Sequence, residues 1–513
     1  MLFYEIARTS AEVAETSARL RKIERLAGLL RHLRPQEVPI AVAYLSGRLP
    51  QGTIGVGWGS LRERPAAAPP PPTLELREVD SALRRVTSAT GAGSQARRRD
   101  ELTRLLARAT ELEQRFLVGL LVGELRQGAL EGVMAEAVAR AAEVPAEHIR
   151  RALMLAGDLG AVAAAAIADG GRGLARFRLA PLQPVQPMLA QAAAGLEDAL
   201  DRARPASLEW KLDGARIQVH RLGREVRAFT RNLAEISDRV PEVVEAARVL
   251  PVEAAILDGE AIALHADGRP QSFQVTMSRF GSRLDADELR RKLPLSSFFF
   301  DCLHLDGDDL VDRPARERFA ALAERVPDGL RVPRIDTDKA AVAARFLEDA
   351  LDRGHEGVMV KSLDATYDAG RRGGSWLKVK RAHTLDLVVL AAEWGHGRRR
   401  GWLSNLHLGA RDSATGAFVM LGKTFKGMTD EMLAWQTEKL LRLETGRDAA
   451  AVYVRPELVV EVAFDGLQQS PRYPGGLALR FARVKRYRPD KHAAQADTIE
   501  TVRALSRGAC VGA

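Results

Sequence analysis

A lysine followed at once by a tight turn is the first feature that could carry chemistry. Lys211 precedes Leu212, Asp213 and Gly214, and a run typical of a strand follows at Ile217. An Asp-Gly turn can project a neighbouring amine into a pocket. A neutral lysine amine is a nucleophile where burial or nearby cations lower its pKa. The pattern predicts a reactive lysine, although a surface hairpin with an incidental lysine is an alternative for so short a motif.

Further blocks could supply the rest of a nucleotide site. Glu260 and Glu356 are hard oxygen ligands of the kind that Mg²⁺ prefers. Phe300 ends an aromatic run that could stack on a purine, and Lys378 and Lys380 alternate onto one face of a predicted strand, where they could bind phosphates. The blocks span residues 230–232, 258–260, 298–301, 356–361 and 376–380.

Each block alone also has an ordinary explanation. Glu260 and Glu356 could be solvated strand ends, residues 298–300 could be core, and the paired lysines could face solvent, since charged residues usually lie at the surface. Together, the blocks contain what nucleotidyl transfer requires: an amine nucleophile, two carboxylates for a metal, an aromatic plate and cations for phosphates. We therefore interpret them as one site.

In order and spacing, these blocks resemble those of ATP-dependent DNA ligases, a family of covalent nucleotidyltransferases related to RNA ligases and mRNA capping enzymes. The resemblance runs over nearly the whole chain. It implies that Lys211 carries AMP as a phosphoramidate, that Glu209 reads the adenine edge, and that Phe300 stacks on the adenine face. It also implies nucleotide contacts for Arg216, Arg231, Arg372, Lys378 and Lys380, a ribose or metal contact for Glu260 and a metal contact for Glu356. Arg371 competes with Arg372 for its role.

Outside the central blocks, two segments resemble other parts of these ligases, and a third could bind phosphate. Residues 480–483 begin a block in which Asp490 and Lys491 are implied to orient the departing pyrophosphate; Ala482 stands where the family commonly has proline. Residues 123–128 resemble an element that grips the DNA backbone. Residues 91–99 could present amides and cations to a phosphate, or form an ordinary turn before a helix.

The resemblance implies an enzyme that seals nicks in duplex DNA in three steps, with ATP and Mg²⁺ as cofactors and Mn²⁺ as an alternative. Lys211 takes AMP from ATP, AMP moves to the 5′-phosphate of the nick, and the 3′-hydroxyl expels AMP. An RNA ligase or a GTP-dependent capping-type enzyme is the nearest alternative. A nick-binding protein without chemistry is another.

The pattern of expected helices and strands along the chain predicts three domains that would position these residues. Residues 1–180 show apolar spacings of three and four, with helices expected over 102–125 and 134–155, and we predict an all-α DNA-binding domain. After Pro181, Pro184 and Pro187, short strands alternate with helices, which predicts an α/β adenylation domain over 181–384. Several short strands and one helix over 385–513 favour a β-barrel of the OB-fold type.

The composition agrees with a multidomain globular protein. The 513 residues predict about three or four domains, and the net charge of +9 favours a polyanionic partner such as nucleic acid. Two cysteines cannot build a disulfide framework, which favours the cytoplasm, with nucleoid association in a bacterium. No apolar run approaches the roughly 20 residues that cross a bilayer, so no membrane contact is expected. We expect a monomer.

Overall fold

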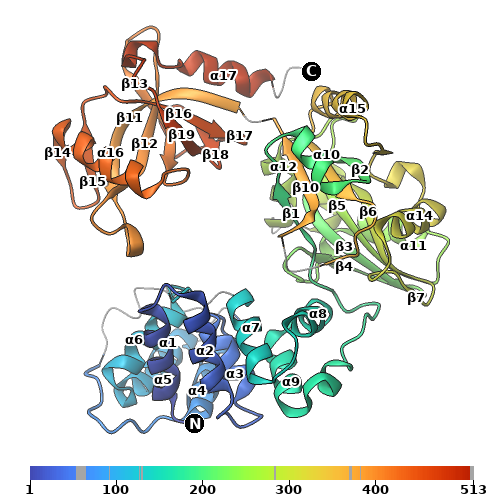
Figure 1. Cartoon of the computed structure of the whole chain (residues 1–513), viewed down its shortest axis with the longest axis vertical. Coiled ribbons are helices and arrows are strands. Elements are labelled where there is room, and N and C mark those ends of the chain that lie inside the picture. The colour runs from blue at the N-terminus through green and yellow to red at the C-terminus, as the bar shows by residue number, and fades with distance from the viewer. Residues whose placement is uncertain are drawn as a thin grey trace.

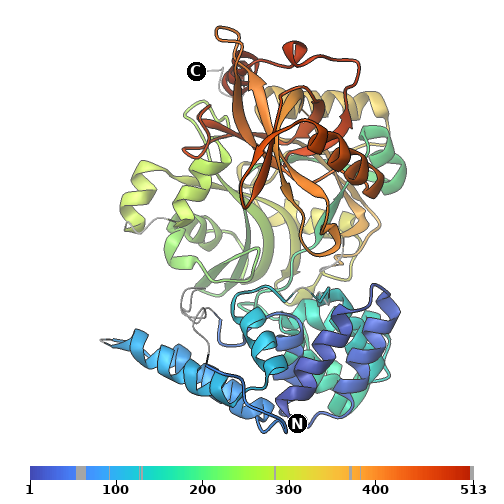
Figure 2. The same ribbon diagram turned by 90° about the vertical axis from the view of Figure 1, so that its left-hand side faces the viewer.

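The computed structural model describes residues 1–52, 65–91, 93–125, 127–128, 131–281, 285–368, 372–381 and 383–508, which form three lobes. A helical lobe lies at the bottom of Figure 1, a middle lobe at the right and a third lobe at the upper left. Figure 2 shows the third lobe in front of the middle lobe, with the helical lobe below both. Among the described residues, no helix is both long and apolar enough to span a membrane.

The helical lobe packs around one core, whose buried side chains run from Phe3 to Leu174. Among its described residues, β structure is limited to an isolated bridge between Leu2 and Glu75. Its helices are α1 (Phe3–Ala14), α2 (Arg19–Leu30), α3 (Val38–Leu45), α4 (Leu76–Ser88), α5 (Ser94–Arg108), α6 (Glu111–Leu121), α7 (Glu131–Ala141), α8 (Ala146–Ala156) and α9 (Leu159–Leu174).

Two helices that the sequence predicted as continuous are divided in the structure. The stretch 102–125 breaks after Arg108, and α6 starts behind Thr110. The Thr110 side chain accepts a bond from the N3 amide, and Glu113 accepts a 2.8 Å bond from the Thr110 amide. This capping box starts a new helix. The stretch 134–155 breaks after Ala141, where Glu143 adopts a left-handed conformation at φ +55° and Pro145 disfavours a helical residue before it.

The middle lobe contains two five-stranded sheets, with strand orders β1-β10-β9-β2-β8 and β4-β3-β5-β6-β7. The strands are β1 (Leu189–Ala192), β2 (Ala206–Lys211), β3 (Ala215–Leu222), β4 (Glu225–Thr230), β5 (Ala254–Ala263), β6 (Leu295–Leu305), β7 (Asp308–Asp309), β8 (Arg334–Asp336), β9 (Gly357–Ser362) and β10 (Arg372–Lys380). Around them lie α10 (Leu196–Ala203), α11 (Pro241–Arg248), α12 (Phe273–Gly281), α13 (Ala286–Lys292), α14 (Ala315–Arg325) and α15 (Ala340–Asp352).

The turn after Lys211 joins the two sheets, because β2 belongs to the first and β3 to the second. At Gly214 a Cβ would lie 2.4 Å from the carbonyl oxygen of Ala261, so this close approach requires glycine. The block at 258–260 follows two strand-forming residues, Ile256 and Leu257, and its pattern predicts that it comes after a strand; it lies within β5 instead, where the pairing shifts between Asp258 and Gly259. A bulge of this kind redirects side chains.

The third lobe is built on a sheet of order β13-β12-β11-β15-β14, with β16 paired to β11 and β19. Hydrogen bonding among its described strands does not close into a barrel. Its elements are β11 (His383–Trp394), β12 (Leu403–Arg411), β13 (Phe418–Thr424), α16 (Asp430–Arg442), β14 (Glu444–Arg447), β15 (Ala451–Val454), β16 (Val459–Phe464), β17 (Gly466–Gln469), β18 (Leu477–Arg480), β19 (Arg483–Tyr487) and α17 (Ile499–Gly508).

Residues 479–484, whose pattern predicts a single strand, form two strands instead, so that prediction is wrong. β18 ends at Arg480 and β19 begins at Arg483, with Phe481 between them at φ +53°. A non-glycine residue in this left-handed region interrupts an extended chain. The interruption lets β18 pair with β17 as a separate hairpin, while β19 joins the main sheet.

Candidate active site

Lys211 lies beside a carboxylate that it shares with a second lysine. Its Nζ forms an ion pair with Glu356, whose other oxygen accepts a 2.8 Å bond from Lys380 Nζ. The Glu356 amide also donates to the Lys211 carbonyl at 3.1 Å, so the backbone of β2 fixes the residue before β9. Burial opposes ionisation of both groups, but Glu356 holds the pKa of Lys211 above its usual value, and the lysines hold that of Glu356 below. In this state Lys211 is protonated.

Glu260 lies near this pair without a bonded partner. It stands opposite Arg216 across β3 and β5, and among the described residues its carboxylate makes no hydrogen bond or ion pair. Burial raises the pKa of Glu260 to about 7, against the opposing effects of Lys211 and Arg216. A carboxylate left without a partner among cations is suited to receive a ligand or a metal ion.

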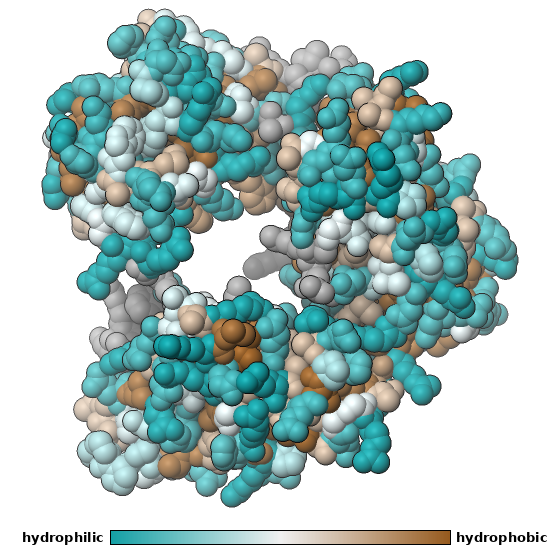
Figure 3. Space-filling view, in the orientation of Figure 1, coloured by the Kyte–Doolittle hydropathy of each residue, from teal (hydrophilic) through white to brown (hydrophobic). Residues whose placement is uncertain are grey.

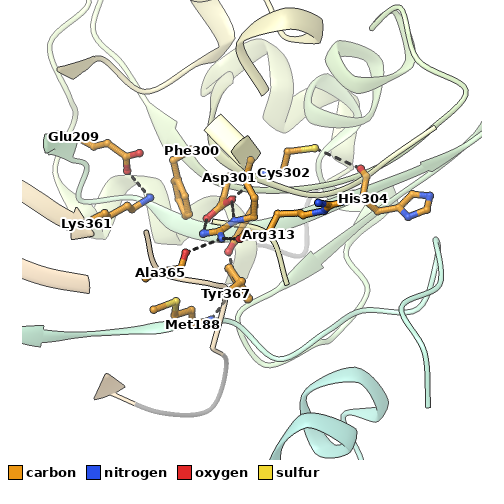
Figure 4. A network of polar contacts seen from close by, with 12 residues as sticks. Met188, Glu209, Phe300, Asp301, Cys302, His304, Arg313, Lys361, Ala365 and Tyr367 are labelled. Carbon is orange, nitrogen blue, oxygen red and sulfur yellow. Dashed lines mark hydrogen bonds and ion pairs between the residues drawn. The ribbon is translucent and has the colours of Figure 1, made fainter. Parts of the chain in front are cut away.

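The carboxylate of Glu209 is occupied by two cations. It accepts a 2.8 Å bond from Arg334 Nε and lies 2.5 Å from Lys361 Nζ, and both Glu209 and Lys361 are fully buried. Lys361 Nζ is 4.4 Å from the centre of the Phe300 ring and 4.1 Å from that of Trp376. Figure 4 shows Lys361 pointing at Glu209, with Phe300 beside them. The structure thus brings Glu209 and Phe300 together, but around a lysine.

Lys361 and Arg334 were not predicted as site residues. Lys361 stands within the block at 356–361, so its position was a usable signal. Burial lowers the pKa of Lys361, against the effect of Glu209. Arg334 enters from β8, far along the chain, and no motif marks it.

Arg216 is held by four protein contacts. Its Nε and Nη2 bind the two oxygens of Asp258 at 2.9 and 2.5 Å, Nη1 donates to the Met188 carbonyl at 2.9 Å, and Nη2 donates to the Tyr367 hydroxyl at 3.3 Å. The guanidinium lies 5.1 Å from the centre of the Phe300 ring. Asp258 and the Tyr367 hydroxyl therefore fix Arg216 beside the aromatic plate.

The remaining predicted cations differ in their surroundings. Lys378 and Lys380 lie on β10, and burial together with Lys380 and Lys211 lowers the pKa of Lys378. Arg231 is exposed at the end of β4 and makes no ion pair with a described residue. The backbone of Arg372 begins β10 and pairs with Leu189. Arg371 lies outside the described residues.

The third lobe reaches this site through other residues than those the sequence singled out. Arg480 Nη1 donates to Asp213 at 2.8 Å, and Asp465 lies 3.5 Å from Lys380 Nζ. Asp490 instead pairs with Arg488, and Lys491 lies 2.5 Å from Asp386 on strand β11. Asp490 and Lys491 therefore contact their own lobe in this arrangement, while the β17–β18 hairpin contacts the middle lobe through Arg480 and Gln469.

The two candidate phosphate-binding segments of the helical lobe are placed differently. Gln127 is buried and joins Ser10 to the Leu45 carbonyl, and Lys22 donates to the Gln127 carbonyl at 2.5 Å. Arg98 donates to the Ala89 carbonyl at 2.7 Å. Residues 92 and 126 lie outside the described residues. The segment at 123–128 is thus anchored in the lobe by Gln127.

Comparisons with known proteins agree with the order of these blocks. The family model for the DNA ligase N terminus matches residues 59–139, that for the ATP dependent DNA ligase domain matches 187–380, and that for the ATP dependent DNA ligase C terminal region matches 399–491. Together these models cover well over half of the chain.

Curated relatives extend the match to the whole chain. A probable DNA ligase of Anaeromyxobacter dehalogenans (strain 2CP-C) is 62% identical over 513 residues, which is 99% of this chain and 100% of the relative. One of Sorangium cellulosum (strain So ce56) is 58% identical over 514 residues, covering 100% of this chain and 96% of the relative.

A solved structure named "Pmar-Lig_PreS3" shares the fold. It covers 94% of this chain and 99% of its own, with a TM-score of 0.63 at 18% sequence identity. The identity of the curated relatives over the full length, together with the three family models, shows that this chain belongs to the ATP-dependent DNA ligase family.

Proposed function

We propose that this ligase seals nicks in duplex DNA through an AMP carried on Lys211. The observation that supports this most directly is the cluster in which Lys211 and Lys380 share Glu356 while Glu260 stands beside them unpaired. An amine, cations and acidic groups thus meet where the two sheets of the middle lobe join. Phosphoryl transfer needs this combination, since it depends on positioning and on charge stabilisation.

The resting pair of Lys211 and Glu356 must separate before Lys211 can attack. A protonated amine has no lone pair, so the proton on Nζ has to leave. Anything that competes for the Glu356 carboxylate removes the main cause of the raised pKa of Lys211. Lys378 and Lys380 then remain as the nearby cations, and they favour the neutral amine.

Glu260 and Glu356 are the residues that would hold Mg²⁺, or Mn²⁺. Mg²⁺ is commonly bound by one or two carboxylates together with substrate phosphates and water, and two carboxylates are what the site offers. Within the described residues, no cluster of three or more acidic, histidine or cysteine side chains could hold a metal by itself. Such an ion supplies Lewis-acid stabilisation of phosphoryl oxygens.

The chemistry follows in three displacements. Lys211 Nζ attacks the α-phosphorus of ATP, a P–N bond forms, and pyrophosphate leaves. The 5′-phosphate of the nick then takes AMP from Lys211, and the 3′-hydroxyl finally displaces AMP as the phosphodiester forms. The negative charge that spreads over the phosphoryl oxygens is stabilised by nearby cations. These are Lys378, Lys380, Arg216, Arg231 and Arg372.

The base would enter between the aromatic plate and the buried ion pairs. Phe300 supplies a ring face, and Glu209 supplies a hydrogen-bonding edge once adenine competes with Lys361 or Arg334 for its carboxylate. A buried polar group rejects a base that leaves it unpaired. We therefore expect Glu209 to bind the amino group on the adenine edge.

The three lobes would act on the DNA together. Figure 3 shows a central opening between them, and the net charge of +9 favours a polyanion there. We assign residues 1–180 to an all-α DNA-binding domain, 181–384 to the adenylation domain and 385–513 to an OB-fold domain, in a monomer that encircles the duplex. DNA affinity should fall steeply as salt rises, and unchanged affinity between low and moderate salt would contradict this clamp.

The test is covalent labelling with α-labelled ATP or GTP and Mg²⁺, followed by denaturing electrophoresis. Label from ATP that is absent in Lys211→Ala, but present in the exposed-lysine control Lys292→Ala, supports the proposal. The labelled protein should then join nicked DNA but not nicked RNA. Label from GTP alone would identify a capping-type enzyme, and joining of RNA alone an RNA ligase. No label from either nucleotide, after pyrophosphate has removed bound AMP, would leave a nick-binding protein.

A further inference from the structure

The segment that connects the helical lobe to the middle lobe is held along one face of β3. Its residues 182–188, called the linker below, lead directly into β1. The β3 residues Arg216, Gln218 and His220 alternate along the strand and therefore point to the same side. All three bind linker backbone atoms, so one strand face binds both the linker and the proposed nucleotide site.

The contacts of Gln218 and His220 form a continuous series. The Gln218 amide oxygen accepts from the Val185 amide at 2.8 Å, and its Nε2 donates to the Val185 carbonyl at 3.2 Å. His220 Nδ1 accepts from the Leu182 amide at 3.0 Å, while its Nε2 lies 2.9 Å from the Gln218 oxygen. Burial lowers the pKa of His220 to about 3, so the neutral ring that these contacts require is present at neutral pH.

The Tyr367 hydroxyl joins the linker to Arg216 and uses its full bonding capacity. It donates to Asp258 at 2.6 Å, accepts from the Met188 amide at 2.9 Å and accepts from Arg216 Nη2 at 3.3 Å. A phenolic hydroxyl has one hydrogen and two lone pairs, so no capacity remains. Figure 4 shows Tyr367 directed at Met188.

Arg216 retains little freedom in this arrangement. Of its five N–H groups, one on Nε, one on Nη1 and two on Nη2 are used by Asp258, Met188 and Tyr367. The N–H that remains is on Nη1, the nitrogen that also binds the linker carbonyl. A nucleotide contact at that nitrogen is thus made by an atom already bonded to the linker.

The linker is joined on its other side to the helical lobe. The Gln186 amide donates to the Met154 carbonyl of α8 at 2.9 Å, and Arg151 of α8 binds Asp312 of the middle lobe. Met154 belongs to the same buried cluster as Val185, Met188, Tyr367 and Phe300. A packed path therefore runs from α8 through the linker to the aromatic plate.

We propose that Tyr367 is a positioning residue that couples occupancy of the nucleotide site to the order of the linker carrying the helical lobe. The proposal rests on the nucleotide contact assigned to Arg216 above. The Tyr367 hydroxyl holds both Arg216, which is assigned to the nucleotide, and Met188, which belongs to the linker. Ordering of the nucleotide site therefore orders the linker, and ordering of the linker orders the nucleotide site. The loaded enzyme then presents its helical lobe to DNA in a narrower range of orientations than the unloaded enzyme.

Tyr367→Phe tests this, because it deletes the hydroxyl and keeps the ring, which packs 5.8 Å from Trp376. We expect KM for ATP in Lys211 adenylylation to rise about tenfold, with kcat of that step within about threefold of wild type, as for loss of a hydrogen bond to a charged group. Affinity of the loaded enzyme for nicked DNA should also fall. An unchanged KM would overturn the proposal.

Gln218→Met is the matched variant on the same strand face. It removes the bonds to Val185 but leaves the Tyr367 hydroxyl and Arg216 intact. We expect several-fold weaker binding of nicked DNA and a rise in KM for ATP that is clearly smaller than in Tyr367→Phe, because the loosened linker acts on Arg216 only through the intact Tyr367 hydroxyl. Equal effects of both variants on KM for ATP would mean general damage to β3 and would overturn the specific role of Tyr367.

Two further measurements separate this inference from the proposed function. If Arg216→Met leaves KM for ATP unchanged, the assigned nucleotide contact itself is wrong and the coupling fails with it; if Arg216→Met raises KM and Tyr367→Phe does not, only the coupling is wrong. In the wild-type protein, loading with AMP should slow hydrogen exchange of peptides covering 182–188. Unchanged exchange there would overturn the coupling even if Tyr367→Phe fails to fold.

Discussion

Glu260 in the middle lobe and Glu393 in the third lobe both lie among cations, yet their pKa values shift in opposite directions. Glu393 accepts bonds from Asn405 at 2.7 Å, His407 at 3.1 Å and Lys423, and these contacts lower its pKa to about 2. Glu260 has cations nearby but no bonded partner among the described residues, and burial raises its pKa to about 7. The two glutamates differ in burial and in hydrogen bonding: Glu260 is buried deeply without a bonded partner among the described residues, whereas the less buried Glu393 accepts several bonds.

This difference separates a structural cluster from a site. A carboxylate with satisfied lone pairs stabilises its surroundings and has nothing left for a ligand. A carboxylate that stays buried without partners costs stability, and proteins keep such groups where function uses them. We therefore expect substitutions at the two clusters to separate activity from stability.

The largest expected effect is on activity, at the carboxylate beside Lys211. Glu356→Gln removes the charge shared by Lys211 and Lys380 and one of the two proposed metal ligands. We expect adenylylation of Lys211 to slow by about 100- to 1,000-fold, as for removal of one preorganised charge-stabilising group. Glu393→Gln should change the same rate by less than twofold. Rapid-quench measurement of label transfer from ATP compares the two, and equal losses would mean that the contrast is wrong.

The next effect is on stability, and here we expect the substitution in the third lobe to cost more than the substitution in the middle lobe. Glu393→Gln leaves Lys423 and His407 with a weaker acceptor, and we expect the third lobe to lose about 1–3 kcal/mol at pH 7. Glu260→Gln breaks no hydrogen bond and should cost less. Hydrogen exchange of amides in β11, β12 and β13 measures the stability of the third lobe separately from that of the rest of the chain. Faster exchange there in Glu260→Gln than in Glu393→Gln would contradict the assignment.

The pH dependence of stability should distinguish the two glutamates further. Glu393 has a lowered pKa, so its contribution is complete above pH 4.5 and declines as pH falls toward 2. Glu260 has a raised pKa: the native state keeps a proton that the unfolded chain loses at about 4.5, so stability falls as pH rises from 4.5 to about 7.

Differences between each variant and wild type would show these two windows. Relative to Glu260→Gln, wild type should lose about 1–2 kcal/mol between pH 4.5 and 7, after allowance for partial exposure. Relative to Glu393→Gln, its advantage should be constant there and shrink below pH 4.5. Calorimetric midpoints over pH 3–8 measure both. A Glu260→Gln difference that does not depend on pH would show that this carboxylate is not held protonated.

Much of the site could be predicted because its residues lie in short local blocks. Lys211 before an Asp-Gly turn and Lys378 with Lys380 on one strand face are patterns within a few residues. The structure places Lys378 and Lys380 on β10, as predicted, and Lys211 at the end of β2. The contacts that decide their charge states are not local. Arg334 meets Glu209 across 125 positions and Tyr367 meets Asp258 across 109, and no spacing rule links such residues.

Elements were predicted best where the hydrophobic pattern is uninterrupted and worst where one residue changes the backbone. Hydrophobic periodicity did not reveal that Thr110 starts a new helix, since the apolar spacing continues on both sides. It also did not reveal the break at Phe481, because 479–484 contains only apolar and basic residues and no glycine or proline that would mark a break. The missed break matters for function, since it frees the hairpin whose Arg480 reaches Asp213.

The smallest predicted effect concerns that hairpin and compares a contact between lobes with one inside a lobe. Arg480→Gln removes an ion pair to Asp213 whose side chains are 17% and 27% exposed, and a cation–π contact 4.5 Å from the centre of the Phe273 ring. Partly exposed contacts of this kind contribute about 0.5–1 kcal/mol each.

Glu393→Gln should loosen the third lobe internally, whereas Arg480→Gln should release the lobe as a unit, with unchanged hydrogen exchange in β11–β13. Small-angle scattering should show a larger radius of gyration for Arg480→Gln than for Arg486→Gln, the control, whose ion pair to Glu461 stays within the third lobe. The difference in radius of gyration between the two variants should diminish at high salt, because screening weakens the ion pair of Arg480 with Asp213 that the control retains. If Arg480→Gln leaves the radius unchanged at low salt, the remaining bonds between Gln274 and Gln469 are sufficient to hold the lobe, and the ion pair to Asp213 does not set its position.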